Sequence, residues 1–273
     1  MKIWTNHSAS RPQDLRLQNS SYALEALAVH LSRHVTLDEC VLEAVRQLPV
    51  VVRDTEKGRY LAREDEAANS YILLLAGYTC RHKMTFEGAR QIVSFQVSGE
   101  AVSSASMFLH EFGTSTQALC RVKAAYIPAG PFRALVDSSP AIRHALQLMA
   151  SIEGSIANEW LLNIGQRPGK ARVAHLLCEI ASRLDAAGLS EAVGYRFLLT
   201  QDQMGDALGL TAIHINRMLK ELRDEGLITR TGQQMFMPDR EALERVGDFS
   251  DRYLHIQPLH PLRLATAAGQ SIS

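Results

Sequence analysis

The sequence has little of what marks a disordered or fibrous protein. It holds nine prolines and 17 glycines in 273 residues, without the Gly and Pro bias of a collagen-like or low-complexity chain. Lys plus Arg and Asp plus Glu number 29 each, so the formal net charge is zero, and 46% of the residues are hydrophobic. A disordered chain would need low hydrophobicity or a large net charge. The sequence therefore predicts a globular protein, and its length favours two domains.

Long apolar runs and cysteine motifs are also missing. The longest apolar run covers only residues 71–76, far short of the roughly 18 to 20 residues that cross a bilayer. The chain turns polar soon after Met1 and offers no apolar core for a secretory signal. We therefore expect a cytoplasmic protein with no membrane partner. No C-x-x-C pair is present, which favours reduced thiols over disulfides or a zinc knot, among Cys40, Cys80, Cys120 and Cys178.

Motifs for catalysis are missing as well. The sequence has no G-x-S-x-G, no H-E-x-x-H and no phosphate-binding P-loop. A cupin-like metalloenzyme, the remote alternative, would need His-x-His with a further Glu and His on one metal, and no His-x-His occurs. His30 and His34 stand four apart on a predicted helix and could face one metal or haem, but such pairs are more often packed or solvated. We expect no enzyme, no metal and no cofactor.

The pattern of apolar residues divides the chain into two halves near residue 140. Residues 22–34 are predicted to form a helix, and a second helix is predicted to begin at Thr36, with Glu39 completing a capping box, and to end at Pro49. Short runs rich in Val, Ile, Leu, Phe and Tyr then alternate with glycines over residues 50–128. This spacing is typical of a small antiparallel sandwich or barrel. The predicted fold class is therefore α+β.

After Pro140 the apolar period changes to about 3.5, which predicts a long helix with one narrow stripe. So narrow a stripe favours a coiled coil between two copies, hence a parallel homodimer. The alternative is that the stripe packs against the chain's own sheet. Arg167, Pro168 and Gly169 end this helix, and a further helix is predicted from Lys170 to Ala187. The dimerisation stripe consists of Ile142, Ala145, Met149, Ile152 and Ile156.

Residues 200–219 have the pattern of a helix-turn-helix. Gly205 permits two helices to cross closely, and Gly209 permits the left-handed turn between them. Thr211 stands where the N-cap of the second helix should be, so the first amides of that helix can meet a phosphate. Two short strands around Gly232 would then complete a winged helix-turn-helix. Helical domains that never bind DNA share this spacing. DNA binding must therefore be predicted from the residues on the outward face of the second helix.

The outward residues of the second helix suit the edges of DNA bases. Arg217 can bridge O6 and N7 of guanine, Asn216 can pair with adenine, and Ala212 or Ile213 can touch a thymine methyl group. We therefore predict binding to double-stranded DNA. The predicted contact residues are Gln201, Thr211, Ala212, Ile213, His214, Asn216, Arg217 and Lys220.

Over about residues 36–250 the chain resembles the Crp/Fnr family of bacterial transcription regulators. The similarity is strongest in residues 159–163, 174–179 and 199–227. The resemblance implies a cyclic-nucleotide-binding-like β-roll, a long dimerisation helix and a C-terminal winged helix-turn-helix. It divides the chain into an N-terminal tail (1–20), a sensor domain (21–138), the dimerisation helix (139–166), the DNA-binding domain (167–249) and a C-terminal tail (250–273).

The resemblance also implies partners and contacts. A homodimer would bind an inverted repeat whose half-sites lie about 34 Å apart, and RNA polymerase is an implied partner. Arg217 matches the arginine of the family, and Gln201 matches a family phosphate contact. Ile213 and Asn216 depart from the glutamate and the serine or glycine that members often carry. The operator sequence therefore cannot be transferred from better-known members.

The sensor half keeps only part of the family's effector site. Gly99 and Glu100 match the start of its nucleotide-binding helix, but Ser115 and Thr116 stand where its arginine is expected. Losing that guanidinium removes a charge-assisted partner of the cyclic phosphate, so we expect no cAMP. Residues 1–39 hold no cysteine for a [4Fe-4S] cluster. The leading hypothesis is a regulator without an effector; the alternative is a dimeric sensor whose small-molecule, haem or redox effector controls DNA binding.

Overall fold

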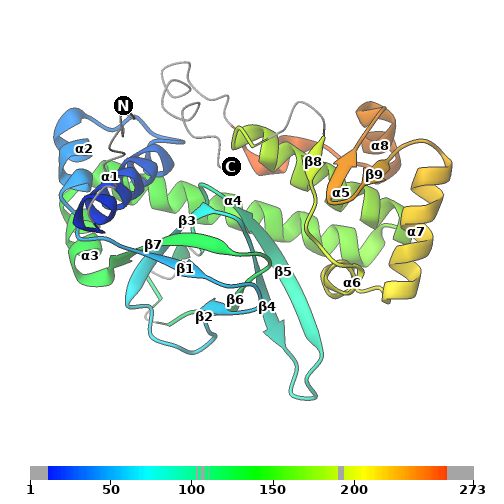
Figure 1. The fold of residues 1–273 in the computed structure, drawn as a ribbon, viewed down its shortest axis with the longest axis horizontal. Coiled ribbons are helices and arrows are strands. Elements are labelled where there is room, and N and C mark those ends of the chain that lie inside the picture. The colour runs from blue at the N-terminus through cyan, green and yellow to red at the C-terminus, as the bar shows by residue number, and fades with distance from the viewer. Residues whose placement is uncertain (1–11, 103, 106–107, 110, 190–193, 257–273) are drawn as a thin grey trace, which may run out of the picture.

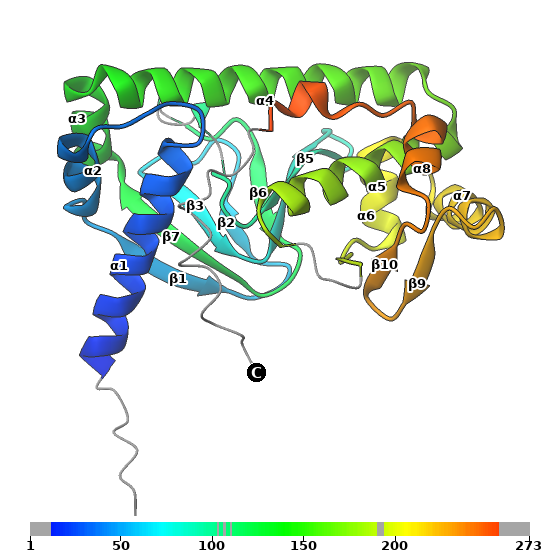
Figure 2. The ribbon, with the colours of Figure 1, turned by 90° about the horizontal axis from the view of Figure 1, so that it is seen from above.

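The computed structural model describes residues 12–102, 104–105, 108–109, 111–189 and 194–256. Figures 1 and 2 show one long helix, α4 (Pro140–Gln166), running past a β-sheet half and a smaller C-terminal half. The fold is α+β, as predicted. No helix within these described ranges is long and apolar enough to cross a membrane.

Seven antiparallel strands in two sheets build the N-terminal half, which confirms the predicted small antiparallel β-structure. One sheet has the order β1-β7-β3 and the other the order β2-β6-β4-β5. Strand β3 carries the longest apolar run because it is buried on both faces: Ile72 and Leu74 face one core cluster, whereas Tyr71, Leu73 and Leu75 face another. The strands are β1 (Val51–Thr55), β2 (Tyr60–Ala62), β3 (Ser70–Ala76), β4 (Tyr78–Met84), β5 (Arg90–Val97), β6 (Ser115–Ala118) and β7 (Val122–Pro128).

Three helices cover the sheet that contains β3: α1 (Pro12–Leu31), α2 (Glu39–Arg46) and α3 (Ala129–Ser138). The predicted boundaries of the first two were wrong. Helix α1 begins ten residues before the predicted start at residue 22, so a tail over 1–20 is too long. The side chain of Asp38, not Thr36, caps α2 by accepting a hydrogen bond from the amide of Val41 at 2.8 Å, because aspartate is at least as good a cap as threonine.

The predicted dimerisation stripe lies on the inner side of α4. Ile142, Ala145 and Met149 are buried in the core formed with α1 and α3, while Ile152 and Ile156 are half-buried and face β5. Ile142, Ala145 and Met149 therefore pack against their own chain, as the alternative had it, whereas the assignment of Ile152 and Ile156 to a seam between two copies stays a prediction. A helix laid along its own domain needs the same apolar period as a coiled coil. The exposed residues of α4 include Gln147, Ser151, Gly154, Asn158 and Leu161.

The C-terminal half packs four helices on a small sheet of order β8-β10-β9. Strand β8 and helix α8 were not predicted, and the predicted C-terminal tail begins too early, because η2 packs against α4 and α5. The part of that tail beyond residue 256 lies outside the described residues. The elements are α5 (Gly169–Ala186), β8 (Tyr195–Arg196), α6 (Gln201–Leu208), α7 (Ala212–Asp224), β9 (Thr229–Thr231), β10 (Gln234–Phe236), α8 (Arg240–Gly247) and the 3-10 helix η2 (Asp251–Leu254).

The two halves share one continuous hydrophobic core. Phe95 of β5 packs against Trp160 of α4, with ring centroids 5.7 Å apart, and the same cluster continues through α5 to α7. Polar contacts fix α6 to the sheet: Arg90 pairs with Asp206 at 2.5 Å, and Gln91 donates to the carbonyl oxygen of Ala207 at 3.2 Å. The sheet that contains β5 therefore sets the position of the helix-turn-helix.

Candidate nucleic-acid interface

The turn between α6 and α7 is built as the sequence predicted. Gly209 adopts φ +64°, the left-handed region that glycine enters without strain. A Cβ atom on Gly205 would lie 2.5 Å from the carbonyl oxygen of Leu210, so only glycine fits where the two helices meet. Thr200 and Gln203 form a capping box at the start of α6. These contacts fix the angle at which α7 leaves the turn.

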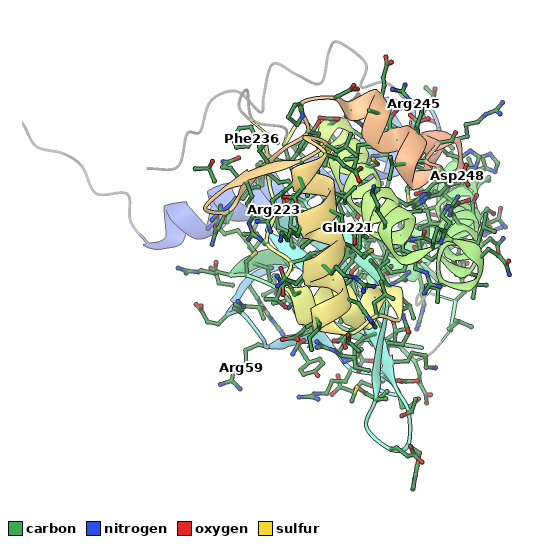
Figure 3. The ribbon with its side chains drawn as sticks, turned by 90° about the vertical axis from the view of Figure 1, so that its right-hand side faces the viewer. Arg59, Glu221, Arg223, Phe236, Arg245 and Asp248 are labelled. Atoms are coloured by element: carbon green, nitrogen blue, oxygen red, sulfur yellow. The ribbon has the colours of Figure 1, made fainter. Side chains whose placement is uncertain are left out.

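Helix α7 presents its polar side to solvent. Ile215, Met218, Leu219 and Leu222 are buried. Figure 3 shows α7 lying across the face of the molecule that points away from the sheet half, with Glu221 and Arg223 on it. Seven of the eight predicted DNA contact residues are exposed, and the eighth, Ala212, is half-exposed. Ile213 is 81% exposed, which is unusual for a large aliphatic side chain and leaves it open for contact with a partner.

The first turn of α7 holds one side chain in place. The hydroxyl of Thr211 accepts a hydrogen bond from the amide of His214 at 3.3 Å, and its Oγ1 lies 3.2 Å from Nδ1 of His214. Nε2 is therefore the ring nitrogen left at the surface. The remaining amides of this turn and the positive end of the helix dipole favour an anion such as a phosphate.

The charges on α7 are only weakly engaged. Arg217 lies 3.9 Å from Glu221, and the two side chains are 64% and 43% exposed. Exposed pairs of this kind contribute about 0 to 1 kcal/mol. Arg217 can therefore leave Glu221 for a base or a phosphate at little cost.

The four predicted effector residues do not form one site. Ser115 and Thr116 lie on β6 opposite His82 and Arg81 of β4, and the Ser115 hydroxyl accepts from the amide of Glu64 at 3.1 Å. Gly99 lies in the turn after β5 with φ +86°. Of the four, Glu100 alone lines the pocket described next.

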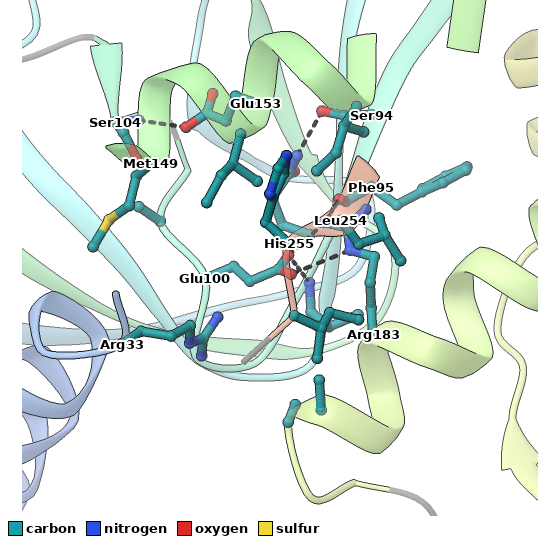
Figure 4. Close-up of a pocket in the computed structure, with 18 of the residues that line it drawn as sticks. Arg33, Ser94, Phe95, Glu100, Ser104, Met149, Glu153, Arg183, Leu254 and His255 are labelled. Carbon is teal, nitrogen blue, oxygen red and sulfur yellow. Dashed lines mark hydrogen bonds and ion pairs between the residues drawn. The ribbon is translucent and has the colours of Figure 1, made fainter. Parts of the chain in front are cut away.

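A pocket lies between β5, α4, α5, the end of α1 and residues 254–256 (Figure 4). Two ion pairs between arginine and glutamate lie in the walls of the pocket. Arg183 of α5 binds Glu100 at 2.6 Å, and Arg81 of β4 binds Glu153 of α4 at 2.8 Å. The sequence did not single out Arg81, Glu153 or Arg183, because no local motif marks residues that meet only through the tertiary fold.

His30, Cys80 and Cys178 are buried inside the fold. Both ring nitrogens of His30 are engaged, with the carbonyl oxygen of Gly99 at 3.0 Å and the hydroxyl of Tyr71 at 2.8 Å. Burial, and then the charge of Arg33, lower the pKa of His30 to about 3, so it is neutral. Burial also raises the pKa of Cys80 to about 11 and of Cys178 to about 12, so both thiols stay protonated at neutral pH. Among the described residues, no group of three or more His, Cys, Asp or Glu side chains could hold a metal ion.

Comparison with known proteins identifies both halves. Residues 52–139 match the family model described as a cyclic nucleotide-binding domain, and residues 171–246 match the Crp-like helix-turn-helix domain. The chain belongs to the Crp/Fnr family. It is a DNA-binding transcription regulator and not an enzyme.

Crp/Fnr relatives span most of the chain at low identity. The nitrogen fixation regulation protein FixK of Azorhizobium caulinodans is 25% identical over 222 residues, covering 79% of this chain and 87% of FixK. The transcriptional activator Anr of Pseudomonas aeruginosa is 25% identical over 187 residues, covering 68% of this chain and 76% of Anr. The structure of FixK2 from Bradyrhizobium japonicum has a TM-score of 0.68 at 21% identity, covering 74% of this chain and 100% of that chain.

This Crp/Fnr chain carries a buried polar network that its sequence did not reveal. The carboxylate of Glu179 accepts hydrogen bonds from Trp160 at 2.9 Å, from the Tyr253 hydroxyl at 2.8 Å and from Arg183 at 3.1 Å. Arg183 also donates to the carbonyl oxygen of Phe95 at 2.6 Å. The network therefore joins the sensor sheet, α4, α5 and η2. Residues 159–163 carry part of the family resemblance, but nothing local in the sequence predicts the partners of Glu179 and Arg183.

Proposed function

We propose that this regulator binds an inverted-repeat operator as a homodimer, with α7 of each copy in the major groove, and that it needs neither cAMP nor an iron–sulfur cluster. The observation that carries the proposal is the outward face of α7, where an arginine, an asparagine and an exposed isoleucine lie near the N-terminus of the helix. That combination suits base edges, a thymine methyl group and a phosphate. RNA polymerase is the partner that the family suggests.

The outward face of α4 supports the homodimer. Ser151 and Gly154 leave room for a second helix to approach, and nothing lies within 4 Å of where a Cβ on Gly154 would be. Leu161 and Leu162 are 71% and 45% exposed on the same helix. Apolar side chains left uncovered on a long helix favour burial against a partner. We therefore place the dimer contact on this face, opposite to the stripe chosen from the sequence.

Two features of the sensor half support activity without the family's better-known effectors. Ser115 and Thr116 bring no guanidinium for a cyclic phosphate, and both acids of the pocket already have arginine partners. A [4Fe-4S] cluster needs four converging thiolates, whereas Cys80 lies buried in β4 and Cys178 buried in α5. The pocket itself favours a second candidate, in which another small molecule controls DNA binding.

Selection from a random duplex pool tests the proposal. The full chain is incubated with the pool, with and without cAMP, and the enriched duplex is then studied by sedimentation. We expect an inverted repeat, two chains per duplex, and the same affinity with cAMP. No enrichment, or one chain on an asymmetric site, would refute the binding mode, and tighter binding with cAMP would refute independence from it.

A further inference from the structure

Two hydrogen-bond donors in the wall of the pocket hold a carboxylate of the chain itself, that of Glu153. The amide of Ser104 donates to Oε1 of Glu153 at 3.0 Å, and Nη1 of Arg81 donates to Oε2 at 2.8 Å. Figure 4 shows Glu153 reaching from α4 toward Ser104, with Ser94 nearby. Nε of Arg81 donates to the Ser94 hydroxyl at 2.7 Å, which holds the guanidinium in place. Both carboxylate oxygens are therefore bound.

The donors around Glu153 are those that bind anions in proteins. A guanidinium and a backbone amide aimed at one point recognise a carboxylate or a phosphate through charge-assisted hydrogen bonds. The side chains of Arg81 and Glu153 are only 17% and 27% exposed. Water screens such a pair less than the pairs on the surface, so the contact is stronger.

A buried layer lies behind these two donors. Ser104 is 2% exposed; burial raises the pKa of the Tyr71 hydroxyl, and the side chain of Ser104 lies close enough to lower that pKa in part. Tyr71 is itself bound to His30 of α1 and stacked on Phe132 of α3, with ring centroids 4.5 Å apart. This pair of donors, the cradle, therefore belongs to the sheet half, whereas the anion belongs to α4.

We propose that Glu153 is a built-in anionic ligand of the sensor: its carboxylate holds α4 against the sheet half and keeps the DNA-binding half in place without an effector. The site binds a carboxylate with one negative charge, and the same chain provides this carboxylate. A second anion would meet the charge of Glu153 in the same cradle, so an external phosphate is excluded while that side chain is present. The inference rests on the proposed function, because its consequence is operator binding by α7.

The test removes the carboxylate and returns it as acetate. Wild type, Glu153→Ala and Glu153→Gln are compared for affinity to the selected operator in sodium acetate or sodium chloride at equal ionic strength. Glu64→Ala is the matched control, because Glu64 also pairs with a cation of β4, Lys83 at 2.7 Å, but does not belong to α4. The melting temperature of each protein is measured in both salts.

We expect Glu153→Ala to bind the operator on the order of tenfold more weakly, the loss of one or two charge-assisted hydrogen bonds. Acetate, and not chloride, should restore most of the affinity and raise the melting temperature of that variant. Wild type and Glu64→Ala should not respond to acetate. Glu153→Gln should lose part of the affinity and show no acetate response, because the amide fills the cradle without the charge.

Two results would overturn the inference. One is operator binding by Glu153→Ala or Glu153→Gln at wild-type affinity. The other is an Ala variant whose affinity and melting temperature are the same in acetate and chloride. If Glu153→Ala has no folded baseline, the Gln variant decides by its affinity alone. Should wild type bind no duplex at all, the proposed function fails, and the acetate shift in melting temperature still decides whether Glu153 fills an anion site.

Discussion

The outer face of α7 and the sensor pocket hold similar numbers of charged groups and use them in opposite ways. On α7, Arg217 has one distant partner and stays exposed. In the pocket, Arg81 and Arg183 each bind a carboxylate of the same chain at short distance. Charges left loosely paired at a surface can recognise a partner, whereas charges paired inside a fold hold its parts together. The charges of the first region are therefore available to a partner, as the proposed function requires, whereas those of the second hold parts of the fold together.

The sharpest way to break this contrast is to remove a paired charge of the second region. Arg183→Ala leaves Glu100 and Glu179 without their shared partner in a buried place, so unfolding in urea should lose roughly 3 to 5 kcal/mol. Arg245→Ala, on an exposed pair with Glu241, should change little. Equal midpoints for the two variants would show that Arg183 does not hold the halves together.

Acid should weaken the sensor half through His30. Its pKa is lowered in the fold, from 6.5 to about 3, so the unfolded chain binds more protons between these values and stability is lost as pH falls below 6.5. At pH 4.5 the loss from this one group is roughly 2.5 kcal/mol. Denaturant midpoints of wild type and His30→Gln, measured at pH 7 and 4.5, should show a smaller acid effect in the variant. His144→Gln, at an exposed site, should behave as wild type; equal acid losses in all three would rule His30 out.

Removing the exposed charge on α7 with Arg217→Ala tests the other half of the comparison. We expect a loss of about 1 to 3 kcal/mol in operator affinity, with relaxed preference at one base pair of each half-site and no change in folding. Competition binding against operators altered at single positions measures both effects. Arg223→Ala, further along α7, serves as the control. A uniform loss on every duplex would make Arg217 a phosphate contact instead.

The smallest effect on folding is expected on the outer side of α4. Leu161→Glu should shift the protein from dimer to monomer in sedimentation at micromolar concentration, while its unfolding free energy changes by about 0.5 kcal/mol or less, as for most exposed sites. Met149→Glu, on the inner side, should instead unfold the N-terminal half, because a charge would enter its core. A Leu161→Glu protein that stays dimeric would move the contact elsewhere.

The sequence predicted the DNA-binding half better than the sensor half, for a physical reason. Gly205, Gly209 and Thr211 answer local steric demands within one segment of 20 residues, so each can be identified from its neighbours alone. The apolar period of α4 is also visible in the sequence. A period does not tell whether the chain's own domain or a second copy covers the apolar stripe. The pairs of Glu153 with Arg81 and of Glu100 with Arg183 join residues 72 and 83 positions apart, and no local rule connects them.

The central claim is that two copies of α7 bind one symmetric operator. Hydroxyl-radical footprinting of the full chain on the selected duplex tests it most directly. The account predicts two protected patches related by a two-fold axis, with centres about 34 Å apart, one turn of the double helix. A single patch without symmetry, or uniform cleavage along the duplex, would contradict it.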